Sequence, residues 1–196
     1  MPVIVVTSDK GEETEKRVLQ QGAMDFVIRP CEPEVLLRRV GNLIEYRTAR
    51  EALTDMEYDS MTGCYTKQAF FHYASLLLRQ QSMPYSLFVT DIDGFKAINE
   101  RFGPSAGDQI LRQIGASLQP TVGPLQLLGR YDSDRFLCLT PTALLDDVHG
   151  PLATYQRLVS QEIIPGVRVV GKVGLYRDVD ITLTVAGMCD RAVLAL

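Results

Sequence analysis

Apolar and polar residues alternate along the chain in blocks that predict short strands and amphipathic helices. The apolar run at residues 2–8 predicts a buried strand that ends in hydroxyl side chains, and residues 25–28 predict a second strand. Residues 12–21 between them have helix-forming composition, and Gly22 ends that helix. Strands that alternate with helices in short units indicate a parallel α/β arrangement.

A long helical pattern follows at residues 34–56, with Gly41 as its one weak position. The first half of this pattern carries an apolar stripe, made of Leu36, Leu37, Val40, Leu43 and Ile44. The stripe thins beyond Tyr46. We expect a connector helix at residues 47–58 that pairs with a second copy of the chain, which would make the protein a homodimer. The alternative is a helix that packs on its own N-terminal unit.

The clearest candidate chemistry follows the apolar run Leu87–Val89, which predicts a buried strand. Two carboxylates, Asp91 and Asp93, stand where this strand should end. Residues two apart on a strand share a face, so both acids point toward one spot beside the carbonyl of Ile92. These oxygen ligands suit Mg²⁺. The alternative is that Asp93 only caps a helix that begins near Phe95.

Composition excludes several classes of function. The 196 residues suit one large or two small domains, with 46% hydrophobic residues and a net charge of −4. This balance is not basic enough for a nucleic-acid-binding surface. No segment approaches the roughly 20 apolar residues of a membrane span, and no signal peptide is visible. The four cysteines are scattered without paired spacing, which predicts reduced thiols in a cytoplasmic protein.

The first 46 residues resemble the C-terminal half of a response-regulator receiver domain, which has a flavodoxin-like fold. The resemblance rests on the order PVIVVTS, then GAMDFVIRP, then an amphipathic helix. It implies that Thr7 is the switch hydroxyl and that Arg29-Pro30 occupies the family's Lys-Pro step, whose peptide is typically cis. Arginine at this step keeps the positive charge but changes its geometry. The alternative is a generic βαβα fragment.

The receiver family carries its phosphoacceptor aspartate and its acidic metal pair in the N-terminal half. This chain does not contain that half. We therefore expect no phosphorylation of the usual receiver type, and we expect residues 1–46 to be a partial receiver domain.

Four separated motifs in residues 55–196 resemble those of GGDEF domains and occur in the same order. They are DSMTGCYTK at 59–67, DIDGFKAINERFGPSAGD at 91–108, GRYDSDRFLCL at 129–139, and the closing pair GKVGLYRD and VAGMCDRAV. The resemblance implies a palm-like α/β (α+β) sandwich at residues 59–196, with a central sheet that contains antiparallel strands and is flanked by helices. GGDEF domains are diguanylate cyclases, in which two facing domains condense two GTP molecules into cyclic di-GMP.

The resemblance also assigns a metal site. Asp91, the Ile92 carbonyl and Asp134 would hold Mg²⁺, and Lys96 would be a catalytic residue that supplies positive charge near phosphate. Catalysis in this family is mainly positioning and cation-assisted charge neutralisation.

Asn99 and Asp108 match the family's guanine-binding residues. A carboxylate accepts hydrogen bonds from guanine N1–H and the exocyclic amine, and a carboxamide both donates and accepts along the base edge. The alternative is that Asn99 is a surface helix residue and that Asp108 caps a helix that starts near Gln109.

Three departures from the family pattern count against catalysis. Asp132 and Ser133 replace two hairpin glycines, although both residue types are compatible with a turn. Arg135 replaces the second acid of the signature and could pair with Asp134 or Asp91 in competition with a metal ion. The chain also stops at Leu196, before the position of the family's phosphate-binding Lys and Arg.

The sequence therefore predicts a cytoplasmic protein of two-component or cyclic di-GMP signalling with a degenerate GGDEF domain. We expect it to bind GTP or to act as an interaction module for signalling proteins, without efficient turnover. We expect no nucleic-acid partner and no membrane association. One alternative is an active diguanylate cyclase. Another is an interaction scaffold with no role for a nucleotide.

Overall fold

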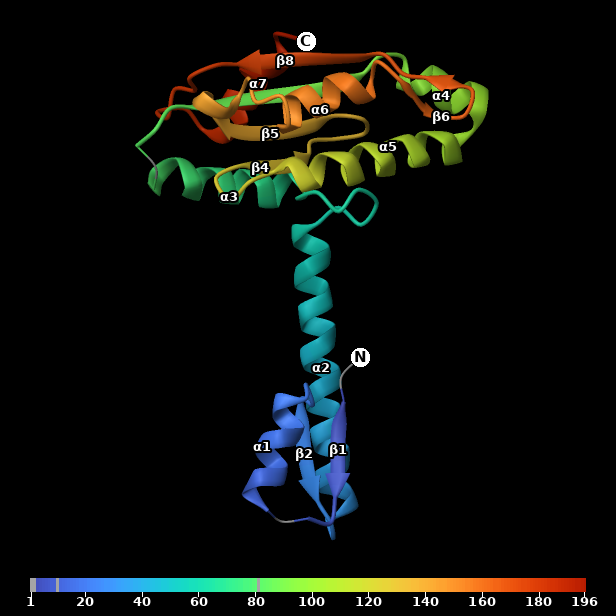
Figure 1. Ribbon diagram of the computed structural model, residues 1–196, viewed down its shortest axis with the longest axis vertical. Coiled ribbons are helices and arrows are strands. Elements are labelled where there is room, and N and C mark those ends of the chain that lie inside the picture. Colours follow the sequence, from blue (N-terminus) through green and yellow to red (C-terminus); the bar gives the residue numbers. More distant parts are fainter. Residues whose placement is uncertain (1–2, 10, 81) are drawn as a thin grey trace. The chain divides into compact units, whose positions relative to one another are not determined.

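The computed structural model of the chain describes residues 3–9, 11–80 and 82–196. They divide into two compact units, residues 1–54 (unit 1) and residues 55–196 (unit 2). Figure 1 labels their helices and strands. Each unit is described separately below.

Unit 1 contains a parallel pair of strands and the start of a long helix. Its elements are β1 (Ile4–Thr7), α1 (Glu12–Gln20), β2 (Asp25–Ile28) and α2 (Pro33–Glu57), the last of which continues into unit 2. One helix thus spans most of the predicted connector at 47–58. The side chains at positions 49–51, 53 and 55 lie outside the described residues.

The predicted switch residues of unit 1 lie together at the ends of its two strands. Thr7 is opposite Ile28 in the parallel register, and its carbonyl accepts a hydrogen bond from the Arg29 amide at 2.7 Å. The Thr7 hydroxyl accepts one from the Asp9 amide at 3.1 Å. The Arg29–Pro30 peptide is cis.

Unit 2 is a sheet of four antiparallel strands in the order β4-β5-β3-β8, with helices on both faces. In Figure 1 the unlabelled green strand β3 runs between β5 and β8, in agreement with the strand pairing. The strands and helices of unit 2 are α3 (Lys67–Gln80), β3 (Tyr85–Ile92), α4 (Phe95–Phe102), α5 (Pro104–Leu118), β4 (Leu127–Arg130), β5 (Phe136–Pro141), α6 (Pro151–Leu158), β6 (Glu162–Ile164), β7 (Val167–Arg168), β8 (Gly171–Tyr176) and α7 (Val185–Val193). This confirms the predicted mixed α/β sandwich.

The central strand β3 contributes to two hydrophobic cores because its side chains alternate between the faces of the sheet. Leu87 and Val89 pack in the core that contains residues of α3 and α7. Phe88 and Ile92 pack in the core that contains residues of α4, α5 and α6. All four are at most 2% exposed, and burial of each contributes about 1.5–3 kcal/mol. The C-terminal end of β3 is therefore held firmly from both sides.

Strands β4 and β5 form a hairpin whose turn is residues 131–135. The Tyr131 amide closes the turn by donating to the Arg135 carbonyl at 2.8 Å. Asp132 and Ser133, which replace glycines of the GGDEF pattern, lie within this turn without preventing it.

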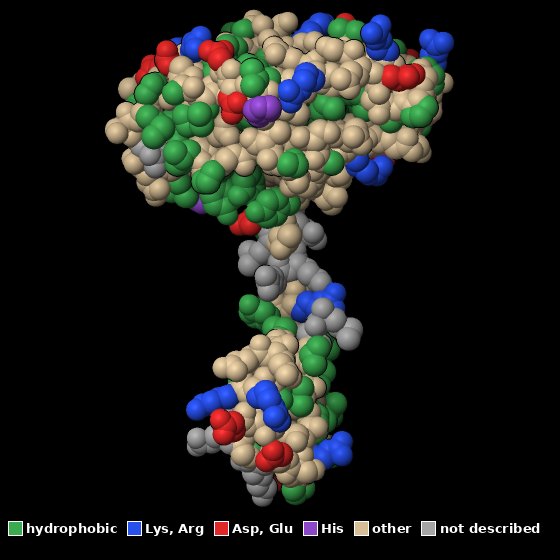
Figure 2. Space-filling model, viewed as in Figure 1, with side chains coloured by type: hydrophobic (Ala, Val, Ile, Leu, Met, Phe, Trp, Pro, Cys, Tyr) green, Lys and Arg blue, Asp and Glu red, His purple; other side chains and the backbone are tan. Residues whose placement is uncertain are grey.

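None of the helices in the described part of the chain is long and apolar enough to cross a membrane. On the face of unit 2 shown in Figure 2, acidic and basic side chains are interspersed, without a continuous basic stripe.

Candidate functional site

A pocket lies at the C-terminal end of β3, between the start of α4 and the tip of the β4–β5 hairpin. Its volume is about 450 Å³. Its lining consists of Gly94, Phe95, Lys96, Asn99, Ser133 and Asp134. Four residues singled out in the sequence, two from α4 and two from the hairpin, thus face one pocket.

The turn from β3 into α4 is made by Gly94, which has a left-handed backbone with φ of 67° and serves as the N-cap of the helix. The alternative in which Asp93 caps this helix is therefore wrong. The Asp93 carboxylate instead accepts an ion-pair hydrogen bond from Nζ of Lys172, on β8, at 2.8 Å.

The β3–β5 register explains why Asp134 lies beside Ile92. The pairing ends with Thr90 opposite Phe136, and Asp134 lies two residues before Phe136, beside the end of β3. The Ile92 amide donates to the Asp134 carboxylate. The amide and the carbonyl of one residue in an antiparallel strand point to the same side, so the Ile92 carbonyl also faces the hairpin.

Asp134 is a partly buried acid with a like charge beside it. Burial, and next the negative charge of Asp91, raise the pKa of its carboxyl group, and the Ile92 amide only partly offsets this. Two carboxylates that repel one another in a partly desolvated place favour a bound cation, which removes the repulsion.

The charged side chains of the hairpin form a different ion pair from the one that the sequence predicted. Arg135 pairs with neither Asp134 nor Asp91. It holds both carboxylate oxygens of Asp132, with Nε 2.9 Å from Oδ1 and Nη2 bonded to Oδ2. The two charge changes of the signature therefore neutralise each other within the turn.

Four acids surround the end of β3, and two of them have a cationic partner. Asp93 is paired with Lys172, and Asp132 is paired with Arg135. Among the described residues, no ion pair within 4 Å is formed by Asp91 or Asp134. Their combined charge matches that of one divalent cation.

These residues fit Mg²⁺ only together with oxygen ligands from outside the protein. No group of three acidic, histidine or cysteine side chains among the described residues is arranged to hold a metal ion. Mg²⁺ commonly uses one or two carboxylates together with phosphate oxygens and water, and Asp91, Asp134 and the Ile92 carbonyl supply the protein part of such a set.

Asn99 has an unsatisfied polar atom at the pocket. Its Oδ1 is buried and has no hydrogen-bond partner among the described residues. Gly107 of α5 lies directly against it, because a Cβ atom built on Gly107 would be 2.0 Å from Oδ1. An unpaired buried oxygen costs about 1–3 kcal/mol. As placed, this oxygen faces Gly107, so the carboxamide has to turn before a ligand in the pocket can donate a hydrogen bond to it.

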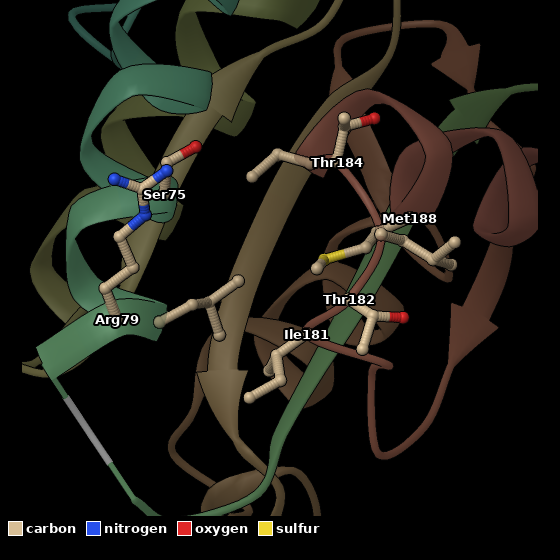
Figure 3. Close-up of a pocket in the computed structure, with 9 residues that line it drawn as sticks. Ser75, Arg79, Ile181, Thr182, Thr184 and Met188 are labelled. Carbon is tan, nitrogen blue, oxygen red and sulfur yellow. The ribbon is translucent and has the colours of Figure 1, made fainter.

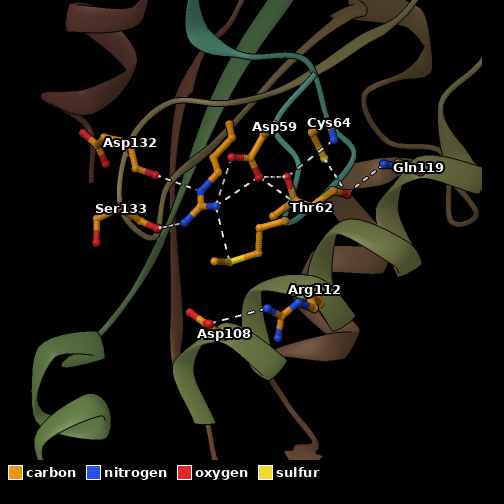
Figure 4. Close-up of polar contacts among 10 residues, drawn as sticks. Asp59, Thr62, Cys64, Asp108, Arg112, Gln119, Asp132 and Ser133 are labelled. Carbon is orange, nitrogen blue, oxygen red and sulfur yellow. Dashed lines mark hydrogen bonds and ion pairs between the residues drawn. The ribbon is translucent and has the colours of Figure 1, made fainter. Parts of the chain in front are cut away.

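Asp108 does not line this pocket. It lies within α5, which begins at Pro104, so the alternative in which it caps a helix near Gln109 is wrong. Figure 4 shows its carboxylate facing Arg112, at 3.5 Å from Nη2. The side chain is 41% exposed, which leaves it accessible.

Lys96 lies on the rim of the pocket. Its side chain is 90% exposed, and Nζ is 3.9 Å from Glu100 one turn along α4. An exposed pair of this kind is weak, so the ammonium group is free to reach a phosphate.

Arg130 anchors the hairpin to the segment that precedes α3. Its Nη1 donates to both carboxylate oxygens of Asp59, at 3.0 and 3.2 Å, and Nη2 donates to the Ser133 carbonyl at 2.7 Å. Figure 4 shows Asp59, Asp132 and Ser133 around this guanidinium group. A second hollow of about 300 Å³ lies here, lined by Asp59, Thr66, Lys67, Arg130, Tyr131, Asp132 and Ser133.

Two residues near the site were not found from the sequence. Tyr155 of α6 donates its hydroxyl hydrogen bond to the Asp91 carbonyl at 2.8 Å. Lys172 lies opposite Asp91 on β8. Hydrogen bonding to Asp93, and to a lesser extent the charge of Asp91, raise the pKa of its ammonium group. Lys172 stands in GKVGLYRD, one of the motifs that resemble GGDEF domains, so its position near the site could have been predicted. Nothing in the sequence links Tyr155 to the site.

A further hollow of about 440 Å³ lies between α3 and the segment that leads into α7 (Figure 3). Figure 3 shows Arg79 from α3 on one side and Ile181, Thr182 and Met188 on the other. It contains none of the site residues predicted from the sequence.

Replacement of Asp134 by asparagine is expected to stabilise unit 2 by a few tenths of a kcal/mol to about 1 kcal/mol at neutral pH, because it removes a repelled, partly buried charge. The raised pKa means that the folded state takes up a proton more readily than the unfolded state. The stability cost of Asp134 is therefore present at neutral pH and disappears as pH falls below about 4. Urea unfolding of both proteins at several pH values measures this, and an equal gap at all pH values would contradict it.

Comparison with known proteins agrees with the motifs. The family model described as diguanylate cyclase, GGDEF domain, matches residues 56–165, which is more than half of the chain. The response regulator PleD of Caulobacter vibrioides is 26% identical over 158 residues, covering 75% of this chain and 35% of PleD. The diguanylate cyclase DgcP of Escherichia coli is 30% identical over 136 residues, covering 67% of this chain and 38% of DgcP. The chain thus spans about a third of the length of these relatives.

Solved structures share the fold. The coiled coil and GGDEF domain of DgcB from Caulobacter crescentus, in complex with c-di-GMP, superposes with a TM-score of 0.64 at 19% identity, covering 82% of this chain and 91% of that chain. The diguanylate cyclase SiaD of Pseudomonas aeruginosa, in complex with its activator SiaC, gives a TM-score of 0.62 at 21% identity, covering 94% of this chain and 69% of that chain.

Proposed function

The chain belongs to the GGDEF (diguanylate cyclase) domain family, and we propose that this member binds a guanine nucleotide without turning it over efficiently. The observation that carries the proposal is the buried, unpartnered Oδ1 of Asn99 at a pocket that also contains Lys96 and Asp134. This oxygen needs a donor, and once the carboxamide turns toward the pocket it can accept from guanine, which presents two donors on the edge of its base.

The surroundings of Asn99 support recognition of a base. Phe95 supplies an apolar surface in the same pocket, and Lys96 and Asp134 mark its polar end. Asp108 is accessible on the neighbouring helix α5 and is a second acceptor for the guanine edge, once its weak contact with Arg112 is given up.

A divalent cation is part of this proposal. When bound, Mg²⁺ neutralises phosphate charge, and Asp91, the Ile92 carbonyl and Asp134 would hold it. The protein contributes two unpaired carboxylates, and a nucleotide contributes the remaining oxygens.

The altered hairpin argues against efficient turnover. Asp132 places a carboxylate and its paired guanidinium at a turn where glycine would leave open space. Arg135 has reversed the charge at the position next to Asp134. A reaction that depends on charge neutralisation and alignment is sensitive to such changes, each of which can lower its rate by orders of magnitude.

Active cyclisation of GTP is the second candidate function. The observation that favours it is that Asp91 and Asp134 remain close together, with the hairpin turn intact. Incubation of the purified protein with Mg-GTP, followed by chromatography, separates the two candidates. Accumulation of cyclic di-GMP over many turnovers would replace our proposal with this one.

Calorimetric titration with Mg-GTP and Mg-ATP tests the binding proposal. We expect GTP to bind and ATP to bind at least tenfold more weakly, since adenine presents a different hydrogen-bonding edge. Absence of heat at millimolar GTP would reject a nucleotide role and leave an interaction scaffold.

Asn99→Ala is expected to weaken GTP binding about tenfold, because it removes a hydrogen bond worth roughly 1–1.5 kcal/mol at the base. The affinity for ATP should change little. Asn42→Ala, which truncates an exposed asparagine in unit 1, is the matched control. Equal affinities of the Asn99 variant and the unaltered protein for GTP would remove Asn99 from the site.

The remaining proposals concern unit 1 and the assembly. We propose that residues 1–46 are a partial receiver domain, that α2 mediates a homodimer through residues 47–58, and that the protein acts in cytoplasmic signalling with other signalling proteins. The parallel pair β1–β2 followed by a helix and the length of α2, 25 residues, support the first two.

A further inference from the structure

Asp91 lies between two cationic residues in the register of the sheet. Lys172 is opposite it on β8, and on the other side of β3 Arg135 directly precedes Phe136, the residue opposite Thr90. Side chains of directly opposed residues share a face of the sheet, with Cβ atoms about 5 Å apart. Lys172 is therefore within reach of the Asp91 carboxylate, and the charge of Asp91 also acts on Arg135.

Each of these cations is bound to another acid. Lys172 holds Asp93, and Arg135 holds Asp132 through two parallel hydrogen bonds. The bidentate geometry fixes the direction of the guanidinium plane more strictly than a single contact would. The Asp91 charge still acts on Arg135, although its effect on the pKa of Arg135 is secondary to that of Asp132.

We propose that Asp132 is a positioning residue that holds Arg135 away from Asp91 and thereby keeps Asp91 available as a cation ligand. The inference rests on the proposed function, since it concerns the cation of the same site. The proposal gives the pair in the turn a role, because the Asp132 carboxylate binds the Arg135 guanidinium group and offsets its positive charge.

Asp132 matters for Asp91 because it decides which acid the Arg135 guanidinium group binds. Once the Asp132 carboxylate is removed, Asp91 is a nearby acid whose charge already acts on the guanidinium group, since Arg135 directly precedes the residue opposite Thr90. A guanidinium bound to Asp91 occupies its oxygens and adds a positive charge where a divalent cation should bind, so the two compete.

Asp132→Asn tests the proposal through the Mg²⁺ dependence of GTP binding, measured by calorimetry with Mg²⁺ and with EDTA. In the unaltered protein we expect Mg²⁺ to strengthen GTP binding at least tenfold. In Asp132→Asn this gain should fall below twofold, and in the double variant Asp132→Asn/Arg135→Gln it should return. Asp146→Asn, which removes an acid from a pair with Arg177 elsewhere in unit 2, should keep the full gain.

The opposite result has a clear meaning. If Asp132 only repelled phosphate, its replacement by asparagine would tighten GTP binding with Mg²⁺ present, and removal of Arg135 would not help. That outcome, or an unchanged Mg²⁺ dependence, would overturn the proposal.

A second measurement does not depend on nucleotide binding. In ¹H–¹⁵N spectra of arginine side chains, the Arg135 Nε–H signal of Asp132→Asn should shift when Asp91→Asn is added. The same Asp91 change should barely move this signal while Asp132 is present. If Asp91→Asn leaves the Arg135 signal unmoved both with and without Asp132→Asn, the positioning role is overturned. Absence of GTP binding together with the expected shift would overturn the proposed function alone.

Discussion

Arg130→Met is expected to lower the free energy of unfolding of unit 2 by about 2–3 kcal/mol, since it leaves the partly buried Asp59 without its counter-charge. The Arg130 side chain is 15% exposed and that of Asp59 is 25% exposed, so solvent screens the pair only in part. The same substitution removes the donor to the Ser133 carbonyl. We therefore expect the hairpin tip to lose its fixed position as well.

The pH dependence of this loss follows from the pKa of Asp59. Burial alone would raise it, but hydrogen bonds from Thr62 and Arg130 outweigh that effect and lower it. A lowered pKa stabilises the fold above the unfolded value of about 3.9, and this contribution is lost as pH falls through the folded value. The difference between Arg130→Met and the unaltered protein should therefore shrink as pH falls below about 4.

Urea unfolding followed by circular dichroism, at neutral pH and near pH 3, measures both effects. Arg177→Met, which breaks an exposed pair with Asp146, is the matched control and should cost less than about 1 kcal/mol. A loss for Arg130→Met as small as the control's would show that the contact with Asp59 does not stabilise the hairpin.

Gly107→Ala is expected to weaken GTP binding more than tenfold and to destabilise unit 2 by about 1–3 kcal/mol, as overpacking of a filled interior does. The added methyl group would lie 2.0 Å from Oδ1 of Asn99 and 2.9 Å from Cζ of Phe95. Both side chains line the pocket, and neither can stay where it is.

Gly187→Ala provides the control for this prediction. Gly187 is also a helical glycine of unit 2, but the nearest atom to its added methyl group would be 3.5 Å away, which is ordinary contact. It should leave GTP binding unchanged and stabilise α7 slightly, because alanine favours helix more than glycine does. Calorimetry measures the GTP affinity of both variants, and thermal unfolding measures their stability. Full GTP affinity in Gly107→Ala would show that Asn99 does not take part in GTP recognition.

Strand and helix positions in unit 1 followed from local patterns, because each element there is bounded by residues with strong local preferences. The predicted strand at 25–28 is β2, and the helical pattern at 34–56 lies within α2. The start of α5, the helix that contains Asp108, was harder to predict. Pro104 starts α5 in its favoured first-turn position, whereas the predicted start near Gln109 rested on the capping preference of aspartate alone.

The places of the proposed ligands in the structure were easier to predict than the partners of their charges. The motif spacing identified Asn99 and Asp134, which share one pocket. The partner of Arg135 was wrongly expected to be Asp134 or Asp91, because the sequence does not show which residue of a tight turn reaches back to another. The partner of Asp93 was equally hard to predict, since Lys172 lies on β8 and becomes its neighbour only when the strands pair.

Ser133 forms part of the wall of both hollows beside the hairpin, the one at Asn99 and the one at Lys67. A displacement of this residue therefore alters two binding volumes at once. By thermodynamic reciprocity, any molecule that binds one hollow and shifts Ser133 changes the affinity of the other by the same factor in both directions. The turn at residues 131–135 is thus a boundary that the two hollows share.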